Sequence, residues 1–394
     1  MFGAIYVGLS GLNAYSRGLQ EVSNNVTNLN SSGFKSSSVS FTDMVSVSGA
    51  GGLSFSDGSA ATGNGVNLAD TAIDFKQGEL RQTDRDLDLA IDGSGFLVLV
   101  RGDDIFYTRT GSFQVDKDGY IVLAGTDYRL ATLDSSGKAV TLSIDTSRTS
   151  PPEATTTIKL SDNLSSTATS FSLADIKVYD STGAEHLWQI QFAKKTGGAP
   201  DEWDVTVTDS TGKTIGTQTL KFTAGTVDPT TDKLVFEDTD AALSVTLDLS
   251  QGVTSFSSGS VSTLRASSVD GHKVGTITSV RVNEQGELEI GYSNEEKTAL
   301  GPIAIADFRD PQQLEQRSGG LFVDANGLGM RELFAPGDAR VGRVLSRRLE
   351  ASNVDLARQF GDLILIQRGF QASSQIISVS NDMIQQLFGI RGQG

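Results

Sequence analysis

An apolar repeat of seven residues at each end of the chain is the feature that most constrains its fold. Near the N-terminus, the repeat positions and the positions three residues after them are apolar at Ile5, Leu12, Tyr15, Leu19, Val22, Val26 and Leu29. Near the C-terminus the same spacing runs through Leu356, Leu363, Phe370, Ile377 and Ile384, while the second position is interrupted at Gln359, Ser373 and Ser380. A seven-residue apolar period is typical of helices that pack along a seam. The sequence therefore predicts one amphipathic, coiled-coil-like helix at each end.

The limits of both helices are predicted by their flanking residues. All seven prolines lie between residues 150 and 337, so neither end contains this helix breaker. The N-terminal helix is expected to stop within residues 28–33, where Asn and Ser compete for backbone hydrogen bonds before a glycine. Ser352 and Asp355 have the spacing of a capping box, so the C-terminal helix is expected to begin near Asn353 and to run to about Phe388.

The middle of the chain predicts β structure. Short runs that alternate apolar and polar residues are bounded by turn residues, as in 176–179, 204–208 and 243–247. A turn motif with Asp first and Gly fourth recurs from Asp134, Asp180 and Asp209. Asp and Gly at these positions suit short β-hairpin loops. The sequence therefore predicts repeated hairpins.

Composition shifts divide this β region. Residues 30–69 are rich in Gly and Ser, which is typical of a connecting arm. Ser/Thr-rich stretches bracket residues 148–270, which could be an inserted domain. We therefore expect an α+β protein with paired terminal helices and two predominantly β outer domains, the second inserted in the first. The expected parts are a terminal helical core of residues 1–29 and 342–394, the arm, an inner β domain of residues 70–147 and 271–341, and an outer β domain of residues 148–270.

Charge and rare residue types exclude several classes of function. The chain has 48 acidic and 32 basic side chains, a balance that argues against non-specific nucleic-acid binding. It has no cysteine and only two histidines, which excludes thiolate metal sites and chemistry built on several histidines. Residues 1–40 carry a formal charge of +1 and residues 341–394 carry +2, so residues 41–340 hold −19. The acidity belongs to the β body, and the predicted helices are close to neutral.

Common enzyme and membrane signatures are also missing from the sequence. It contains no nucleophile elbow, phosphate-binding loop or His-Glu-x-x-His motif, so no catalytic residue, cofactor or metal site is predicted. The Asp116–Gly119 segment favours a tight hairpin over a calcium loop, because the twelfth position from Asp116 is Asp127 where an EF-hand has Glu. No apolar run reaches the roughly 18 residues of a membrane span, and the start lacks a basic signal region. Neither membrane insertion nor a cleaved signal peptide is expected.

Several segments resemble the bacterial flagellar rod–hook family. They are NNVTNLNSSGFK at 24–35, IDGSGF at 91–96, YTRTGSF at 107–113, LEASNVDL at 349–356 and QRGFQASS at 367–374. A common form of the last signature has Ala and Asn where this chain has Gly369 and Ser373. The resemblance frames the chain at roughly residues 1–125 and 300–388 and says least about residues 148–270.

The resemblance implies a structural role and a set of partners. The long middle segment favours a subunit of the hook, the curved tube that transmits torque from rod to filament, over the shorter rod subunits. The implied partners are further copies of the chain in a helical homopolymer, the distal rod protein, the hook cap protein, the hook–filament junction proteins and the flagellar type III export apparatus. The implied location is the extracellular hook. The alternatives are a distal rod subunit, which forms a straight shaft, and a secreted β-rich enzyme, which would need a cluster of titratable groups.

Two groups of residues are expected to carry assembly. The polymerisation core is predicted at Ile5, Leu12, Leu19, Val22, Val26, Leu356, Leu363, Phe370, Ile377 and Ile384. The family-signature interface is predicted at Asn24, Asn25, Asn28, Gly33, Phe34, Lys35, Ser352, Asn353, Asp355, Gln367, Arg368 and Gln371. The three asparagines are expected to bridge chains, with fraying of a helix end as the alternative. The helices are expected at the inner wall of a tube, with residues 148–270 outermost and the arm allowing the outer body to shift.

Overall fold

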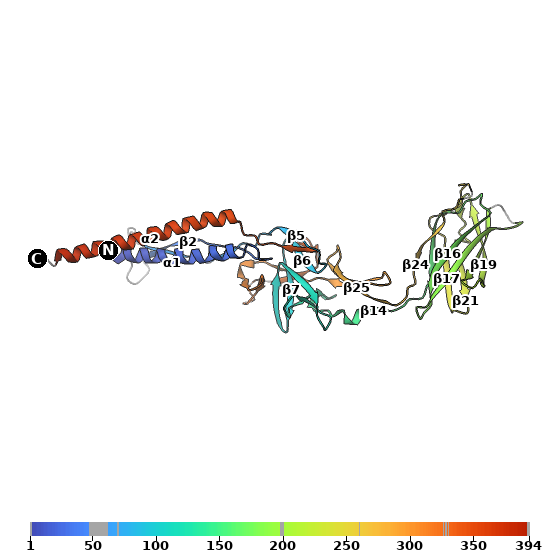
Figure 1. Cartoon of the computed structure of the whole chain (residues 1–394), viewed down its shortest axis with the longest axis horizontal. Coiled ribbons are helices and arrows are strands. Elements are labelled where there is room, and N and C mark those ends of the chain that lie inside the picture. The colour runs from blue at the N-terminus through green and yellow to red at the C-terminus, as the bar shows by residue number, and fades with distance from the viewer. Residues whose placement is uncertain are drawn as a thin grey trace, which may run out of the picture. The chain divides into compact units, whose positions relative to one another are not determined.

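The computed structural model describes residues 2–46, 62–68, 71–197, 201–259, 261–325, 327, 329 and 331–391. It is mostly β, with one long helix near each end of the chain (Figure 1). The chain divides into two compact units. The first unit comprises Met1–Asp145, Val280–Glu289 and Ala299–Gly394, and the second comprises Thr146–Ser279 and Ile290–Thr298.

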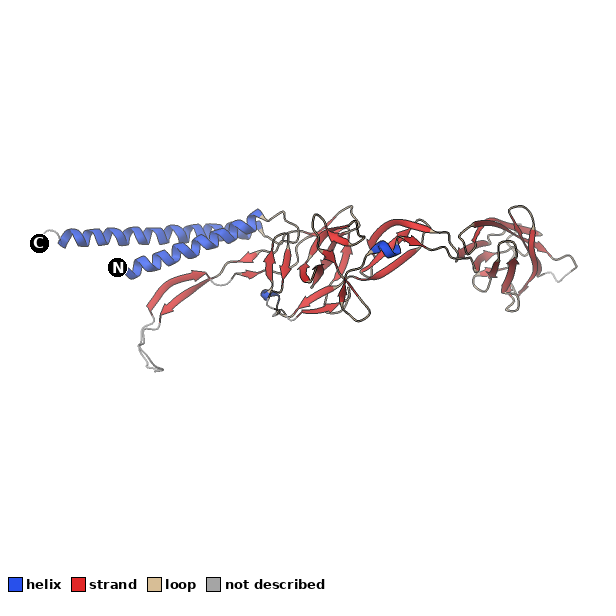
Figure 2. Cartoon of the chain, turned by 90° about the horizontal axis from the view of Figure 1, so that it is seen from below, coloured by secondary structure: helices blue, strands red, loops and turns tan. Residues whose placement is uncertain are grey.

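The two helices of the first unit lie side by side (Figures 1 and 2). Helix α1 spans Phe2–Thr27 and so ends just before the predicted range of 28–33, and α2 spans Leu356–Arg391 and so runs slightly past the predicted end at Phe388. The predicted start of α2 near Asn353 is wrong, because Asp355 itself occupies the capping position. Its Oδ1 accepts hydrogen bonds from the backbone N–H groups of Ala357 (2.9 Å) and Arg358 (3.2 Å), two of the first amides of the helix.

An 11-stranded sheet forms the body of the first unit. Its main path runs β29 (Glu315–Arg317), β30 (Leu321–Val323), β8 (Asp104–Thr108), β7 (Phe96–Arg101), β11 (Arg129–Leu130), β10 (Ile121–Leu123), β9 (Thr110–Val115), β6 (Asp88–Asp92) and β32 (Arg343–Ser346). Strand β28 (Ile305–Phe308) pairs with β7 and with β31 (Arg331–Phe334). Apolar side chains from these strands make the core, including the fully buried Leu89, Ile91, Leu97, Leu99 and Phe113. Burial of these side chains fixes the register of β6, β7 and β9.

Four short strand pairs complete the first unit. They are β1 (Ser37–Ser38) with β4 (Ala72–Ile73), β2 (Phe41–Ser46) with β3 (Thr62–Leu68), β33 (Arg348–Glu350) with β5 (Leu80–Gln82), and β12 (Thr132–Leu133) with β13 (Ala139–Val140). The chain also has short 3₁₀ turns at η1 (Ile144–Ser147) and η2 (Pro311–Gln313).

The predicted connecting arm, residues 30–69, forms strands over much of its described length. Its flanks pair as the antiparallel strands β2 and β3, and β3 lies against α1. The backbone N–H of Val66 donates to the Ser10 hydroxyl of α1 at 3.2 Å, and the rings of Tyr15 and Phe41 lie 5.1 Å apart. Residues 47–61 and 69 of the arm lie outside the described residues.

The second unit is built on a ten-stranded sheet. Its path runs β16 (Ser170–Tyr179), β17 (Glu185–Lys194), β18 (Glu202–Asp209), β19 (Thr214–Thr223), β20 (Thr226–Val227), β23 (Val253–Thr254), β15 (Thr157–Asn163), β22 (Leu243–Asp248) and β21 (Lys233–Asp238), with β24 (Arg265–Val269) paired to β15. Every second residue is buried along much of β17 and β18, as at Trp188, Ile190 and Phe192 of β17. This alternation matches the sequence pattern that predicted half-buried strands.

A further antiparallel sheet has the order β14 (Thr149–Ser150), β25 (Gly275–Val282), β26 (Glu287–Tyr292) and β27 (Lys297–Pro302).

The recurring Asp-x-x-Gly turns close hairpins, as the sequence predicted. Asp209, between β18 and β19, accepts hydrogen bonds at Oδ1 from the backbone of Thr211 and Lys213, each at 2.8 Å, and from the Thr211 hydroxyl at 2.7 Å. The Thr211 hydroxyl and these backbone donors lower the pKa of the Asp209 carboxyl below its usual value. The glycine that follows, Gly212, has φ +84°, a left-handed conformation that suits Gly.

Candidate functional site

The helices α1 and α2 contact each other through their smallest residues. Gly8, Gly11 and Gly18 of α1 are buried against α2. A Cβ at Gly18 would lie 3.3 Å from Ile366 Cδ1, and a Cβ at Gly8 would lie 2.8 Å from Ile377 Cγ1. On α2 the most buried side chains repeat every seven residues, at Gln359, Ile366, Ser373 and Ser380. We call this small-residue contact the seam.

On α2 the seam follows the second position of the predicted seven-residue repeat, at Gln359, Ile366, Ser373 and Ser380. The apolar first positions of the repeat on each helix, which we call the stripes, lie beside it. Of the ten residues predicted for the polymerisation core, Val22 is fully buried in the single chain, at 2% exposure. Three are exposed at 38–42%, and the other six are half-buried; the exposed ones are Leu19, Leu356 and Phe370. The half-buried ones are Ile5, Leu12, Val26, Leu363, Ile377 and Ile384. Glycine and serine allow two helix axes to approach more closely than leucine does. The helices therefore contact each other through these small residues, and the stripes lie beside the contact.

Helix α2 presents apolar side chains on the faces that α1 does not cover. Six large ones are 44–71% exposed, at Phe360, Ile364, Leu365, Ile376, Val379 and Met383. A helix that is apolar around its circumference is normally buried on every side. Pairing with α1 covers only the seam face of α2.

A pit lies where the two predicted stripes meet beside the seam. Its walls are Tyr15 and Leu19 of α1 with Ile366 and Phe370 of α2, and its remaining lining residues are Gln367 and Gln371. The pit has a volume of about 150 Å³ and an almost wholly apolar surface. At this point Leu19 of one stripe and Phe370 of the other border the same apolar hollow.

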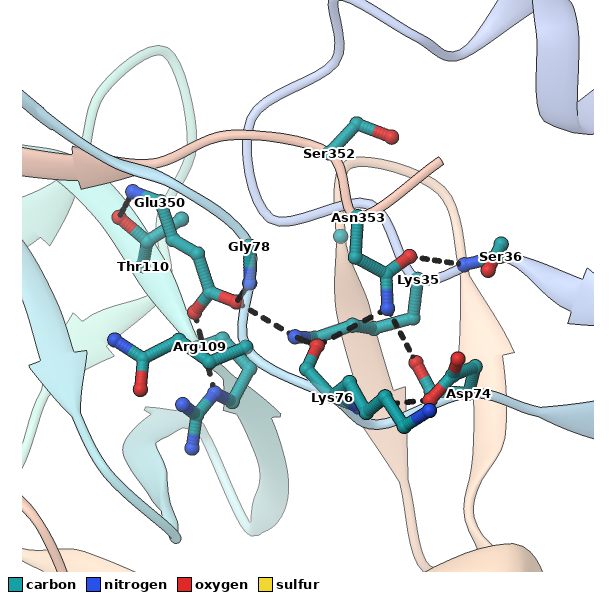
Figure 3. A network of polar contacts seen from close by, with 12 residues as sticks. Lys35, Ser36, Asp74, Lys76, Gly78, Arg109, Thr110, Glu350, Ser352 and Asn353 are labelled. Atoms are coloured by element: carbon teal, nitrogen blue, oxygen red, sulfur yellow. Dashed lines mark hydrogen bonds and ion pairs between the residues drawn. The ribbon is translucent and has the colours of Figure 1, made fainter. Parts of the chain in front are cut away.

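A buried ionic network lies between the start of α2 and the β body of the first unit (Figure 3). Glu350 is its centre. The Lys35 Nζ donates to Glu350 Oε1 at 2.6 Å, and the Arg109 Nε donates to Oε2 at 3.2 Å. The Gly78 N–H also donates to Oε1, at 2.8 Å. We call Lys35, Arg109 and Glu350 the Glu350 network; its three side chains are 0–4% exposed.

Backbone carbonyl groups accept further hydrogen bonds from both cations of the network. Lys35 Nζ also donates to the Lys76 oxygen at 2.6 Å, and the Arg109 guanidinium donates to the oxygens of Gly93 and Gly95, both at 2.5 Å. Burial lowers the pKa of Lys35 from its ordinary value, and the Glu350 carboxylate opposes that shift. The network therefore joins three segments of the chain through one carboxylate.

Two asparagines from the segments that resemble the rod–hook family, Asn25 and Asn353, make further hydrogen bonds near the Glu350 network. Asn353 Oδ1 accepts from the Ser36 N–H at 2.8 Å, and its Nδ2 donates to the oxygens of Asp74 (2.6 Å) and Lys76 (3.0 Å). Asn25 Nδ2 donates to the Ser37 oxygen at 2.8 Å and to Gln359 Oε1 of α2 at 3.0 Å. Asn25 thus bonds within its own chain, and bridging between chains stays a prediction for it.

The other predicted interface residues fall into two groups. Gly33 and Phe34 are buried next to Lys35, and the Gly33 N–H donates to the Glu350 backbone oxygen at 2.8 Å. Those at or near the surface are Asn24, Asn28, Ser352, Asp355, Gln367, Arg368 and Gln371. Asn28 Nδ2 donates to Asn24 Oδ1 at 3.0 Å, so these two amides support the end of α1.

Sequence reasoning missed Arg109, Glu350 and the seam glycines as functional positions. Arg109 and Glu350 lie inside two of the quoted segments, but nothing local shows that they meet. The glycines at 8, 11 and 18 have the three- and seven-residue spacing of a helix seam, and this spacing was the available signal.

Sites for other kinds of chemistry are not found in the described part of the chain. Within it, no three His, Cys, Asp or Glu side chains gather in a way that could hold a metal ion. None of its helices combines the length and apolarity that crossing a membrane requires.

Family models match three parts of the chain, and relatives match almost the whole of it. The models are "Flagellar basal body rod FlgEFG protein C-terminal" at residues 345–390, "Flagellar hook protein FlgE/F/G D1 domain" at 90–167 and "Flagellar basal body protein FlaE D2 domain" at 143–272. The flagellar hook protein FlgE of Salmonella typhimurium is 29% identical over 97% of this chain and 98% of its own length. That of Treponema pallidum is 27% identical over 99% and 100%.

A solved structure is also similar. The alignment with the Helicobacter pylori flagellar hook protein FlgE2 covers 69% of this chain and 99% of the other, with a TM-score of 0.49 and 13% sequence identity.

Proposed function

We propose that α1 and α2 are the polymerisation core of this chain, which belongs to the bacterial flagellar rod–hook family and is a structural subunit of the hook. The observation that supports this role is the apolar surface of α2 that α1 leaves uncovered. Burial of each Leu or Ile side chain contributes roughly 1.5–3 kcal/mol, so covering this surface with other copies favours a polymer. The polymer is a flexible curved tube that transmits torque.

The finer architecture is part of the proposal. The helix pair is coiled-coil-like, and residues 148–270 form an outer β domain inserted in the inner one. The core of the second unit supports the insertion, because in the described part of the chain its buried residues all lie between Ile158 and Leu264. Polar contacts between outer domains are individually weak, so they can be exchanged as the tube bends.

An acidic residue in either stripe should prevent assembly. Leu19→Asp or Leu363→Asp places a carboxylate in every helix contact, where burial disfavours the charged form. We expect loss of sedimentable polymer, with the circular dichroism of the β strands unchanged. Leu363→Met, which nearly conserves volume, should still assemble. Normal tubes from either Asp variant would contradict the assignment of the helices as the core.

Removal of residues 148–270 should spare assembly and change mechanics. The deleted residues contain the whole buried cluster of the second unit, and the cores of the first unit share no residue with it. Electron microscopy is expected to show tubes of altered curvature or stiffness. Complete loss of tubes would show that this segment is needed for assembly.

Partners and export follow from the proposed role. The subunit leaves the cell unfolded through the flagellar type III apparatus, polymerises under a hook cap protein, and contacts the distal rod protein and the hook–filament junction proteins. A chain without cysteine suits such export, because no disulfide can form before assembly. The distal rod subunit is the second candidate, favoured by the match of residues 345–390 to a rod-protein model. Electron microscopy of polymer from purified protein separates curved hooks from straight rods.

A further inference from the structure

We propose that the pit between Tyr15, Leu19, Ile366 and Phe370 receives the side chain of Leu365 from a second copy of this chain. The inference rests on the proposed polymerisation and names one contact that would build it. In the terms used for packed helices, the pit is a hole between side chains, and Leu365 of the second copy is the knob that inserts into it.

The pit suits one apolar side chain. Its volume of about 150 Å³ and its apolar walls leave little for water to bond to. The rim residues Gln367 and Gln371 carry no charge, so a leucine entering the pit does not bury an ion. Filling the pit would bring the exposed Leu19 and Phe370 into contact with apolar atoms.

Leu365 is the knob with the greatest exposure. It is 71% exposed, more than any other large apolar side chain among the described residues. Successive helical residues are about 100° apart, so Leu365 and Gln367 lie on opposite flanks of Ile366. Since Gln367 lines the pit, Leu365 projects from the flank of α2 that faces away from it.

This placement requires another copy as the occupant. A pit on one flank and a knob on the other cannot meet within one helix pair. Between copies they form a contact of two different surfaces, which can repeat from copy to copy and so build a helical assembly when the rotation between copies does not close a ring. The near-neutral charge of residues 1–40 and 341–394 lets many copies pack side by side without strong repulsion.

The absence of native cysteine allows a direct test. One chain carries Leu365→Cys, another carries Leu19→Cys, and the two are mixed, polymerised and oxidised. We expect a disulfide-linked dimer on a non-reducing gel from the mixture and none from either variant alone, because each contact then has one thiol. A disulfide needs Cβ atoms about 3.5–4.5 Å apart, so it reports this contact closely.

The matched control replaces Leu19→Cys with Leu9→Cys, another exposed leucine of α1 that is not part of the pit. This mixture should give no dimer. Polymer without the expected dimer, or equal dimer from the control mixture, would overturn the contact and leave the proposed function standing. Failure of the parent chain to polymerise would count against the proposed function instead. If a variant assembles poorly alone, it is incorporated as a minor fraction of parent polymer, and the same comparison applies.

Discussion

Replacement of Glu350 by Gln is expected to destabilise the first unit by about 3–5 kcal/mol, because it leaves two buried cations without their carboxylate. The amide that replaces the carboxylate has one oxygen that can accept from one of the cations, but its NH2 group is a donor and carries no charge, so Lys35 and Arg109 would otherwise keep only backbone oxygens as partners. At 1.4 kcal/mol for each factor of ten, amide exchange in the first unit should accelerate at least about a hundredfold. The second unit has its own core and should not respond.

Hydrogen exchange separates the two units in one experiment. The amides of β6 and β9 report the first unit, and those of β17 and β18 report the second. Both tryptophans lie in β17 and β18, so tryptophan fluorescence gives an independent measure of the second unit. Glu315→Gln is the matched control, since Glu315 pairs with Arg317 at 2.7 Å on the surface. Adding Lys35→Met to Glu350→Gln should restore part of the loss, and unchanged exchange in Glu350→Gln would refute a stabilising role for the network.

Replacement of Gly369 by Leu is expected to separate the helices and abolish polymer. A Cβ at Gly369 would already lie 2.6–2.7 Å from two ring atoms of Tyr15, and that ring also packs on Phe41 of β2. Overpacking of this kind costs about 1–3 kcal/mol per copy, and every copy in a polymer carries it. The expected results are loss of sedimentable polymer and faster amide exchange in α1 of the unassembled protein.

Gly361→Leu provides the control for this variant. Gly361 is on the same helix, but no described atom lies within 4 Å of its added Cβ. Exchange in α1 should therefore be unchanged by Gly361→Leu. Tyr15→Ala combined with Gly369→Leu should restore pairing by making room for the leucine. If Gly369→Leu pairs and assembles like the parent chain, the seam does not depend on the small residue.

The helices could be predicted from sequence, but their contact could not. The repeat at Leu12 and Leu19 shows that α1 has an apolar side, and α1 begins and ends nearly where expected. A repeat does not say which partner covers that side. The glycine seam covers one face, and Gly369 and Ser373, the two departures from the common family signature, lie in it opposite Tyr15 and Gly11.

The polar contacts of the Glu350 network and of the asparagines near it were predicted only in part. The segment from Asn24 to Lys35 and the residue Asn353 were singled out by resemblance, and the structure brings Asn25, Lys35 and Asn353 to one place. All three have their partners within one chain, and local sequence does not show which distant carbonyl or carboxylate those partners will be. Glu350 was missed for the same reason. Bridging between chains, expected of Asn24, Asn25 and Asn28, stays a prediction.

The Glu350 network has a consequence for the order in which the chain can fold. Its salt bridge joins residues 315 positions apart in sequence. Contacts between such distant residues form late, because the entropy of closing a long loop must be overcome first. A chain that is synthesised from its N-terminus contains Lys35 and Arg109 long before Glu350 is added, so the core of the first unit cannot close around them early. The second unit, whose core residues span only Ile158 to Leu264 in the described chain, is free of this delay.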